Sequence, residues 1–281
     1  MKPRPKDWVK CAPHEPKLAG RVALISGGDS GIGRAVAIAM ATEGADIAIL
    51  YLDEHRDAKE TVLSIEGVGR RVFSMAGDVG DERFCRRAVA RAVKQFGHLD
   101  ILVNNAGIQH TAPFGDVTTE LWNDILAVNL SAAFHTMRHA LPRMAKASYG
   151  RVINIASVHG LVASVSKAPY VSAKFGLVGL SKVAALEYAG IGSADSGGVT
   201  VNCICPGWVD TALVAPQIAE RREELGVSSE AAIDALLAEK QPSRRLSSPA
   251  EIARLAVWLC AADAHNITGT AIPVDGGWTA Q

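Results

Sequence analysis

The chain has 281 residues, of which 48% are hydrophobic and 21% are charged, a composition typical of a globular protein with a sizeable core. Lysine plus arginine and aspartate plus glutamate number 29 each, so no net charge favours a nucleic-acid partner. No apolar stretch approaches the roughly 18 residues that a membrane span needs, which argues against a membrane protein.

The first residues, MKPRPKDWVKCAPHEPK, are rich in proline and lysine and lack the apolar segment of a signal peptide. This pattern predicts an extended arm over residues 1–17, lying on a partner or on the protein's own surface. A single domain is expected over residues 18–281.

The five cysteines are odd in number and scattered along the chain. Cys203 and Cys205, two residues apart in VTVNCICPGW, would share one face of a strand. A buried apolar face is expected there rather than a metal site, because no second cluster of ligands follows. This cysteine usage indicates a reducing, cytoplasmic location.

Short apolar runs alternate with longer helical patterns along the domain. Near-continuous apolar strands between helices are typical of a parallel sheet covered on both faces, and they predict one doubly wound, Rossmann-like α/β domain with seven strands. Ligands bind beyond the carboxyl ends of the strands in such a sheet. The expected strands are 21–26, 46–51, 71–76, 100–105, 151–157, 200–205 and 270–274, and clear helical patterns cover 81–96 and 118–146.

A glycine-rich segment, SGGDSGIGRAVAIAMA, follows the first strand and opens a helix. Gly27, Gly31 and Gly33 form a GxxxGxG pattern, in which backbone N–H groups can approach a pyrophosphate at the positive end of the helix. Glycine turns join strands to helices in many proteins, but this position in a βαβ unit favours dinucleotide binding. Asp29, Ser30 and Ile32 belong to the same expected phosphate loop.

Several further motifs, in the right order, resemble those of the short-chain dehydrogenase/reductase family. They are NNAG at 104–107, Asn129, the spacing of Ser157, Tyr170 and Lys174, and PG at 206–207 followed by Thr211. The resemblance extends from about Leu18 to the C-terminus and implies a nicotinamide-dependent oxidoreductase. It implies cofactor contacts from Asp78, Val79, Asn105, Ala106, Gly107, Tyr170, Lys174, Pro206, Gly207, Val209 and Thr211. The alternative role for Asp78 is a solvated helix cap.

The residue that ends the second strand selects between the two nicotinamide cofactors. An acid there binds the adenine-ribose hydroxyls, whereas a base binds a 2′-phosphate. Tyr51 occupies this position, with Asp53 and Glu54 just beyond it, and positions 30 and 52 carry no arginine or lysine. Because the nearby acids would repel a 2′-phosphate, the pattern favours NAD over NADP.

The run SVHGLVASVSKAPYVSAK, residues 157–174, carries the expected proton-transfer groups. Lys174 lies four residues after Tyr170 on a predicted helix, and Pro169 suits its first turn, so the two side chains share one face. A free tyrosine has a pKa of about 10, and a neighbouring lysine cation and an oxidised nicotinamide would both favour its phenolate. Ser157, ending the fifth strand, would hold the substrate oxygen while Tyr170 moves its proton. By resemblance, Asn129 completes the catalytic set by holding a relay water near Lys174.

Two more residues of this run point to the substrate. His159 lies two residues after Ser157 and Lys167 three before Tyr170, so chain geometry keeps both near the reacting centre. Each alone is more often a solvated loop residue, but two potential cations together suggest an anionic substrate, because a carboxylate leaving water must be paired.

Within the family, NAGIQH, NIASVHGLVAS, ICPGWVDT, AEKQPS and the terminal VDGGWTAQ resemble the branch that interconverts D-3-hydroxybutyrate and acetoacetate. The first half of the chain resembles another branch with poorly defined substrates, so a sugar, a polyol or a 3-oxoacyl compound is an alternative substrate. A cofactor-sensing protein without turnover is a further alternative, disfavoured because a sensor needs no proton relay. The resemblance to the D-3-hydroxybutyrate branch implies substrate contacts from Gln109, Ser157, His159, Lys167, Tyr170, Trp208 and Gln217.

The segment at about 208–246 interrupts the alternation of strands and helices and predicts one or two amphipathic helices. A long insertion at the carboxyl end of a strand is more often a lid than a structural ornament, so a substrate lid is expected. The helix PYVSAKFGLVGLSKVAALEYAG carries the small residues Ser172, Gly176 and Gly179, which permit close approach of a second copy. Family members build tetramers with this helix, which implies a homotetramer of dihedral symmetry.

Overall fold

The computed structural model describes residues 16–193 and 195–280, so the predicted arm over 1–17 lies almost entirely outside the described residues. The strands are β1 (Val22–Ser26), β2 (Asp46–Tyr51), β3 (Val72–Ala76), β4 (Ile101–Asn104), β5 (Tyr149–Ile155), β6 (Gly198–Pro206) and β7 (Ala271–Val274). The longer helices are α1 (Gly31–Thr42), α2 (His55–Gly67), α3 (Glu82–Phe96), α4 (Thr119–Leu126), α5 (Ala132–Lys146), α6 (Ala168–Tyr188), α7 (Ala215–Leu225), α8 (Ser229–Lys240) and α9 (Pro249–Cys260).

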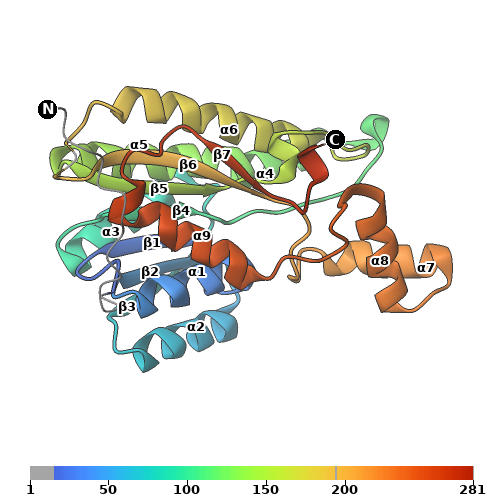
Figure 1. The fold of residues 1–281 in the computed structure, drawn as a ribbon, viewed down its shortest axis with the longest axis horizontal. Helices are drawn as coiled ribbons and strands as arrows, with labels where there is room; N and C mark the ends of the chain where they lie inside the picture. Colours follow the sequence, from blue (N-terminus) through green and yellow to red (C-terminus); the bar gives the residue numbers. More distant parts are fainter. Residues whose placement is uncertain (1–15, 194, 281) are drawn as a thin grey trace, which may run out of the picture.

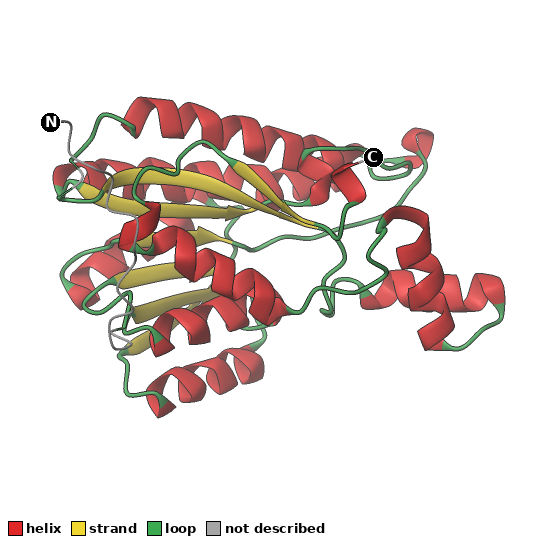
Figure 2. Ribbon diagram, in the orientation of Figure 1, coloured by secondary structure: helices red, strands yellow, loops and turns green. Residues whose placement is uncertain are grey.

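The seven strands form one parallel sheet in the order β3-β2-β1-β4-β5-β6-β7. Helices α1, α2 and α9 cover one face and α3, α5 and α6 the other (Figure 1, Figure 2). The predicted doubly wound α/β architecture is confirmed. The strand order reverses between β1 and β4, and a crevice at such a switch point is where ligands bind in this kind of sheet.

The core lies on both faces of the sheet, which explains the uninterrupted apolar runs in the sequence. Successive side chains of a strand point to opposite faces, so each strand supplies two core clusters. Ala23, Ile25, Ile47 and Ile49 pack with α1 and α9. Val22, Leu24, Ala48 and Leu50 pack with α3 and α5. Cys203 and Cys205 are buried, as the strand pattern predicted.

The helical pattern predicted over 118–146 is interrupted by a π-helical turn, Ala127–Ser131, between α4 and α5. The amide nitrogen of Asn129 donates to the carbonyl of Ile125, 3.0 Å away, and to that of Ile108 at 2.8 Å. These bonds tie the turn to the loop that follows β4. Wide turns of this kind are frequent at functional sites, and this one places Asn129 beside the carboxyl ends of the strands.

The insertion between β6 and α9 forms two helices, α7 and α8, that stand beyond the carboxyl ends of the strands (Figure 1). An ion pair between Arg221 and Glu239 joins the two helices. At the base of the insertion, Ser247 N–H donates to the Trp208 carbonyl (2.9 Å) and Asp210 N–H to the Ser247 carbonyl (3.0 Å). The chain therefore enters and leaves the insertion at adjacent points.

Candidate active site

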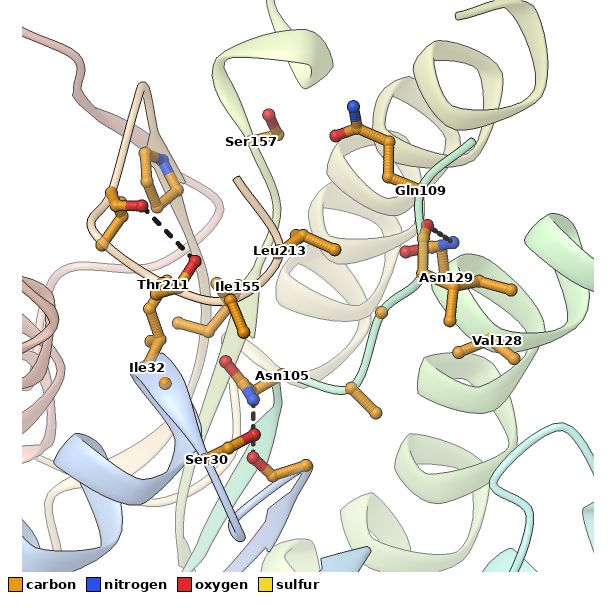
Figure 3. Close-up of a pocket in the computed structure, with 18 of the residues that line it drawn as sticks. Ser30, Ile32, Asn105, Gln109, Val128, Asn129, Ile155, Ser157, Thr211 and Leu213 are labelled. Atoms are coloured by element: carbon orange, nitrogen blue, oxygen red, sulfur yellow. Dashed lines mark hydrogen bonds between the residues drawn. The ribbon is translucent and has the colours of Figure 1, made fainter. Parts of the chain in front are cut away.

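A cleft of about 530 Å³ opens at the carboxyl ends of β1, β2, β4, β5 and β6, beneath the inserted helices. Figure 3 shows Ser157 and Gln109 at one end, Ser30 and Ile32 at the other, and Leu213 between them. The cleft brings together every residue predicted from the sequence to act in catalysis or to contact cofactor or substrate, with the exception of Gly33.

Gly33 does not line the cleft but packs against the backbone of the glycine loop. A Cβ atom on Gly33 would lie 1.8 Å from the carbonyl oxygen of Gly27, so any other residue would push the loop open. Gly27 and Gly31 have φ angles of +61° and +50°, in the left-handed region that glycine tolerates. Ser30, which precedes α1, makes no side-chain cap, so the N–H groups of the first helical turn are free to bind an anion.

The NNAG loop is bound to the glycine loop through short polar contacts. The Asn105 amide nitrogen donates to the carbonyls of Ser26 and Gly27, each 3.1 Å away. The Ser26 hydroxyl accepts from the backbone N–H groups of Asn105 (3.0 Å) and Ala106 (3.1 Å). From the opposite side Thr211 closes over Gly31, where an added Cβ would lie 3.3 Å from its methyl carbon. These contacts hold the two loops together and leave their backbone N–H groups open to a ligand. Such an arrangement fits the diphosphate of a dinucleotide.

The far end of the cleft is lined by residues that follow β2 and β3. Tyr51 ends β2, and its hydroxyl lies 3.0 Å from Nδ1 of His55. Asp78 lines the cleft with Val79 and accepts a hydrogen bond from Gly80 N–H at 2.7 Å. The cap of α3 is Asp81, whose carboxylate accepts from Arg83 N–H. The alternative role of Asp78 as the helix cap is therefore wrong.

At the opposite end, β5 and α6 bring three polar side chains together. Ser157 lies two residues beyond the end of β5, not within the strand as predicted, and starts a single 3₁₀ turn. Its hydroxyl accepts from the His159 N–H at 3.1 Å, and it lies near enough to Tyr170 on α6 to lower the pKa of that phenol. Lys174 lies one turn further along α6; its ammonium donates to the carbonyl of Ile155 at 3.0 Å and lies 5.6 Å from the centre of the Tyr170 ring.

Burial controls the protonation of these groups. It raises the pKa of Tyr170 to about 12, although the nearby Ser157 hydroxyl acts in the opposite direction. Burial also lowers the pKa of Lys174 to about 8. In the protein by itself, desolvation of the phenolate is therefore the dominant influence on Tyr170, and the effect of Lys174 together with an oxidised nicotinamide stays a prediction.

A second, small cavity of about 10 Å³ is lined by Lys174 and Asn129. Its polar lining includes Asn104 and Thr136, and its size matches a single water molecule. The side-chain oxygen of Asn129 is buried and has no hydrogen-bond partner among the described residues. A cavity of this size with a few polar groups, next to an unsatisfied acceptor, fits a relay water.

The predicted substrate residues converge above Ser157. Lys167 donates to the side-chain oxygen of Gln217 on α7 at 2.8 Å, and its ammonium lies 5.5 Å from the ring centre of Trp208. Burial lowers the pKa of Lys167 to about 8, so the group is mostly charged at neutral pH. Burial lowers the pKa of His159 to about 3, so its imidazole is neutral. The expectation of two cations is corrected to one ammonium and one neutral imidazole.

Trp278 lines the same end of the cleft, although the sequence motifs did not predict that it would contact substrate or cofactor. Its ring stacks on Trp208 with 6.2 Å between centres and meets His159 edge-on at 5.4 Å. Asp275 fixes this C-terminal turn by accepting from the backbone and hydroxyl of Thr279. The terminal VDGGWTAQ motif is part of the family resemblance. Nothing in its local sequence indicates that the end of the chain returns to the cleft.

Comparisons with known proteins identify the family. A family model described as enoyl-(acyl carrier protein) reductase matches residues 27–279. A D-beta-hydroxybutyrate dehydrogenase from Cupriavidus necator is 44% identical over 94% of this chain and all of its own length. The chain belongs to the short-chain dehydrogenase/reductase family. A second relative of the same name, from Rhizobium meliloti, is 41% identical over 93% of this chain and 99% of its own.

A solved structure of a short-chain dehydrogenase/reductase shows the same fold. It is that of a candidate short-chain alcohol dehydrogenase from Sinorhizobium meliloti, with a TM-score of 0.83 and 35% identity, covering 95% of this chain and all of that one. The family and its dehydrogenase members imply a nicotinamide dinucleotide cofactor and a small-molecule substrate. Over residues 16–193 and 195–280, no helix is long and apolar enough to cross a membrane.

Proposed function

We propose that this short-chain dehydrogenase/reductase is an NAD-dependent oxidoreductase that interconverts D-3-hydroxybutyrate and acetoacetate. The observation that carries the proposal is the placement of Lys167 and its partner Gln217 beside the Ser157–Tyr170 pair, in one cleft. The relatives from Cupriavidus necator and Rhizobium meliloti, 44% and 41% identical to this chain, are both named for this substrate.

The polar groups at the end of β5 and on α6 suit proton transfer. Ser157 and Tyr170 present two hydroxyls that hold the substrate oxygen, and Tyr170 accepts or donates its proton. Lys174 lies one turn along α6, next to the small cavity beside Asn129. Together they would extend the route of the proton from Tyr170 into the protein. A bound nicotinamide ring would accept or donate the hydride and, when oxidised, would add positive charge that favours the phenolate.

The substrate end suits a short carboxylate. The Lys167 ammonium supplies a charged donor, while the amides of Gln109 and Gln217 supply directed hydrogen bonds. The ring nitrogens of the neutral His159 lie 3.4 Å from the Ser157 hydroxyl and 3.0 Å from that of Ser164, so His159 would contact the substrate by exchanging one of these partners. Trp208 forms an aromatic wall with Trp278, which favours a small aliphatic remainder. A charged donor beside such a wall selects an acid of a few carbons over a polyol.

Turnover of a panel of D-3-hydroxybutyrate, its L-enantiomer, a neutral secondary alcohol, a polyol and a 3-hydroxyacyl thioester, each with NAD and NADP, tests the proposal. We expect the highest kcat/KM for D-3-hydroxybutyrate with NAD. A higher value for the polyol or the thioester would assign the cleft to one of the alternative oxidoreductase substrates. Tight NAD binding with no turnover of any compound would instead support a cofactor sensor.

We also propose that the protein assembles as a homotetramer through α6. This helix exposes an apolar stripe formed by Phe175, Val183 and Leu186, whose exposed fractions are 45%, 53% and 81%. An added Cβ on Gly179 would meet no atom within 4 Å, which leaves room for close approach of another helix. Gly176 has a different role from the one expected, since it packs against Leu130 of the same chain.

A further inference from the structure

Three hydrogen-bonding side chains form a row across the middle of the sheet, whose strands are otherwise apolar. Asn104 on β4 pairs in register with Asn154 on β5, and Asn154 pairs in turn with Cys203 on β6. All three are at most 7% exposed. Buried parallel strands are normally apolar, and a buried polar side chain costs free energy unless it is hydrogen-bonded. The row therefore needs partners, and it lies near the carboxyl ends of these strands, where the cleft opens.

Helix α6 supplies the partner of this row, Ser181. Nδ2 of Asn104 donates to Oδ1 of Asn154 at 2.8 Å, and Nδ2 of Asn154 donates to the Ser181 hydroxyl at 2.7 Å. The Cys203 thiol also donates to this hydroxyl, at 3.0 Å, and the hydroxyl donates its own proton to the Leu177 carbonyl at 2.6 Å. Ser181 is 1% exposed, and these contacts use its one proton and both of its lone pairs. A buried hydrogen-bond network therefore joins the row to the helix.

The face of α6 that carries Ser181 also carries Tyr170 and Lys174, and all three residues are at most 6% exposed. Ser181 follows Lys174 by about two helical turns, or roughly 10 Å along the axis, so both side chains point toward the sheet. Strand β5 is thus bonded to α6 at two points. One is the bond from the Lys174 ammonium to the Ile155 carbonyl (3.0 Å), and the other is the bond from Asn154 to Ser181. Two separated bonds fix the position of a helix along a strand, whereas a single bond allows it to turn or slide.

We propose that Asn154 and Ser181 are positioning residues for proton transfer. Their hydrogen bond holds α6 in register with β5 and thereby sets the distance between the hydroxyls of Tyr170 and Ser157. Ser157 follows Asn154 closely on the same segment of chain, so a shift of α6 along β5 changes this distance directly. Misplacement of a reacting group by about 1 Å can cost about a hundredfold in rate. This inference rests on the proposed role of Ser157 and Tyr170 in the reaction.

Ser181→Ala tests the inference, because it removes one hydroxyl from a residue that lines neither the cleft nor the small cavity. Ser181→Cys, which keeps the volume and weakens the hydrogen bond, is a milder second variant, and Ser181→Thr restores the hydroxyl. Val257→Ala is the control for lost stability, since Val257 is buried on α9, on the other face of the sheet. For each variant kcat, its pH profile, the dissociation constant of NAD and the melting temperature are measured, with the alcohol of the panel above that the natural protein oxidises fastest.

We expect Ser181→Ala to lower kcat about tenfold or more and to move the midpoint of its pH profile by about half a pH unit or more, because Tyr170 and Lys174 are no longer held in the same surroundings. Ser181→Cys should change both in the same direction but less. NAD affinity should change less than about threefold in every variant, and Ser181→Thr and Val257→Ala should keep kcat within about twofold and leave the midpoint in place, even where the melting temperature falls.

An unchanged kcat and pH profile in folded Ser181→Ala, or equal changes in Val257→Ala, would overturn the inference and leave the proposed function intact. Fastest oxidation of an alcohol other than D-3-hydroxybutyrate would overturn the proposed function, whereas the comparison of variants on that alcohol would still decide the inference.

Discussion

Tyr170, Lys174 and His159 show how strongly burial determines the chemistry of single residues in this cleft. Each is at least nine-tenths buried, and each is shifted toward its neutral form, with the pKa of Tyr170 raised and those of Lys174 and His159 lowered. A phenol that stays protonated at neutral pH can donate to a ketone oxygen without any prior ionisation. Oxidation of an alcohol needs the phenolate, and therefore needs added positive charge or a higher pH.

Replacing Tyr170 by phenylalanine should abolish turnover and spare cofactor binding. The ring and its packing remain, but the proton donor is lost, and such a loss costs roughly a hundredfold to ten-thousandfold in rate. Steady-state kcat together with the dissociation constant of NAD, measured by fluorescence, checks this. A variant that retains a tenth of the natural kcat would show that another group moves the proton.

Replacing Lys167 by methionine should raise KM for the hydroxy acid about tenfold or more, because a charged hydrogen bond is worth roughly 1.5–3 kcal/mol. Activity on a neutral secondary alcohol should be spared. The pKa of Lys167 is about 8, so the ammonium is present below that pH and is lost as the pH rises through it. KM for the acid should therefore rise above pH 8 in the natural protein and stay flat in the variant. An identical pH profile in both proteins would contradict the carboxylate role.

At the scale of elements, the base of the inserted helices is tied together by one buried amide. Gln241, at the end of α8, is 1% exposed. Its side-chain oxygen accepts from Trp208 N–H at 3.1 Å, and its nitrogen donates to the carbonyl of Arg245. The amide thus bridges the two chain segments by which the insertion joins the sheet. It also positions the backbone of Trp208, whose ring stacks on Trp278.

Replacing Gln241 by leucine should loosen this junction and raise KM for the substrate by about threefold to tenfold, since each lost hydrogen bond is worth about 1 kcal/mol. NAD affinity should change little, because the glycine loop lies elsewhere. Glu223→Leu, at an exposed position of α7, serves as the control. Equal effects of both variants on KM, or loss of NAD binding in Gln241→Leu alone, would argue against a specific junction.

The regular elements were predictable because their signals are local. Both faces of β1 and β2 are buried, which produces apolar runs that the sequence displays directly. The π turn at Asn129 was not predictable, because one extra residue in a turn hardly alters a helical pattern. The pairing of Trp278 with Trp208 and the neutral state of His159 depend on tertiary burial, which motif spacing does not encode. Motifs thus predicted which residues line the cleft, whereas they did not predict the charge state of His159.

At the scale of the whole molecule, the exposed apolar stripe on α6 predicts that copies of the chain associate through this helix. Replacing Leu186 by glutamate should convert the proposed tetramer into smaller species, because a charge buried in an apolar contact has no partner. Leu63→Glu is the control, since Leu63 is 56% exposed on α2, on the other face of the sheet. Light scattering at micromolar concentration checks both variants. A monomeric natural protein, or dissociation by the Leu63 variant alone, would refute assembly through α6.

The bridge between Val209 and Ser247, where the inserted helices join the sheet, has an evolutionary consequence. Two attachment points that touch each other allow the intervening segment to be exchanged, lengthened or shortened while the strands on either side keep their register. Changes in α7 and α8 can therefore alter the proposed substrate contacts without disturbing the glycine loop at the end of β1. The proposed substrate contact on α7 and the proposed cofactor loop after β1 therefore lie on separate parts of the fold.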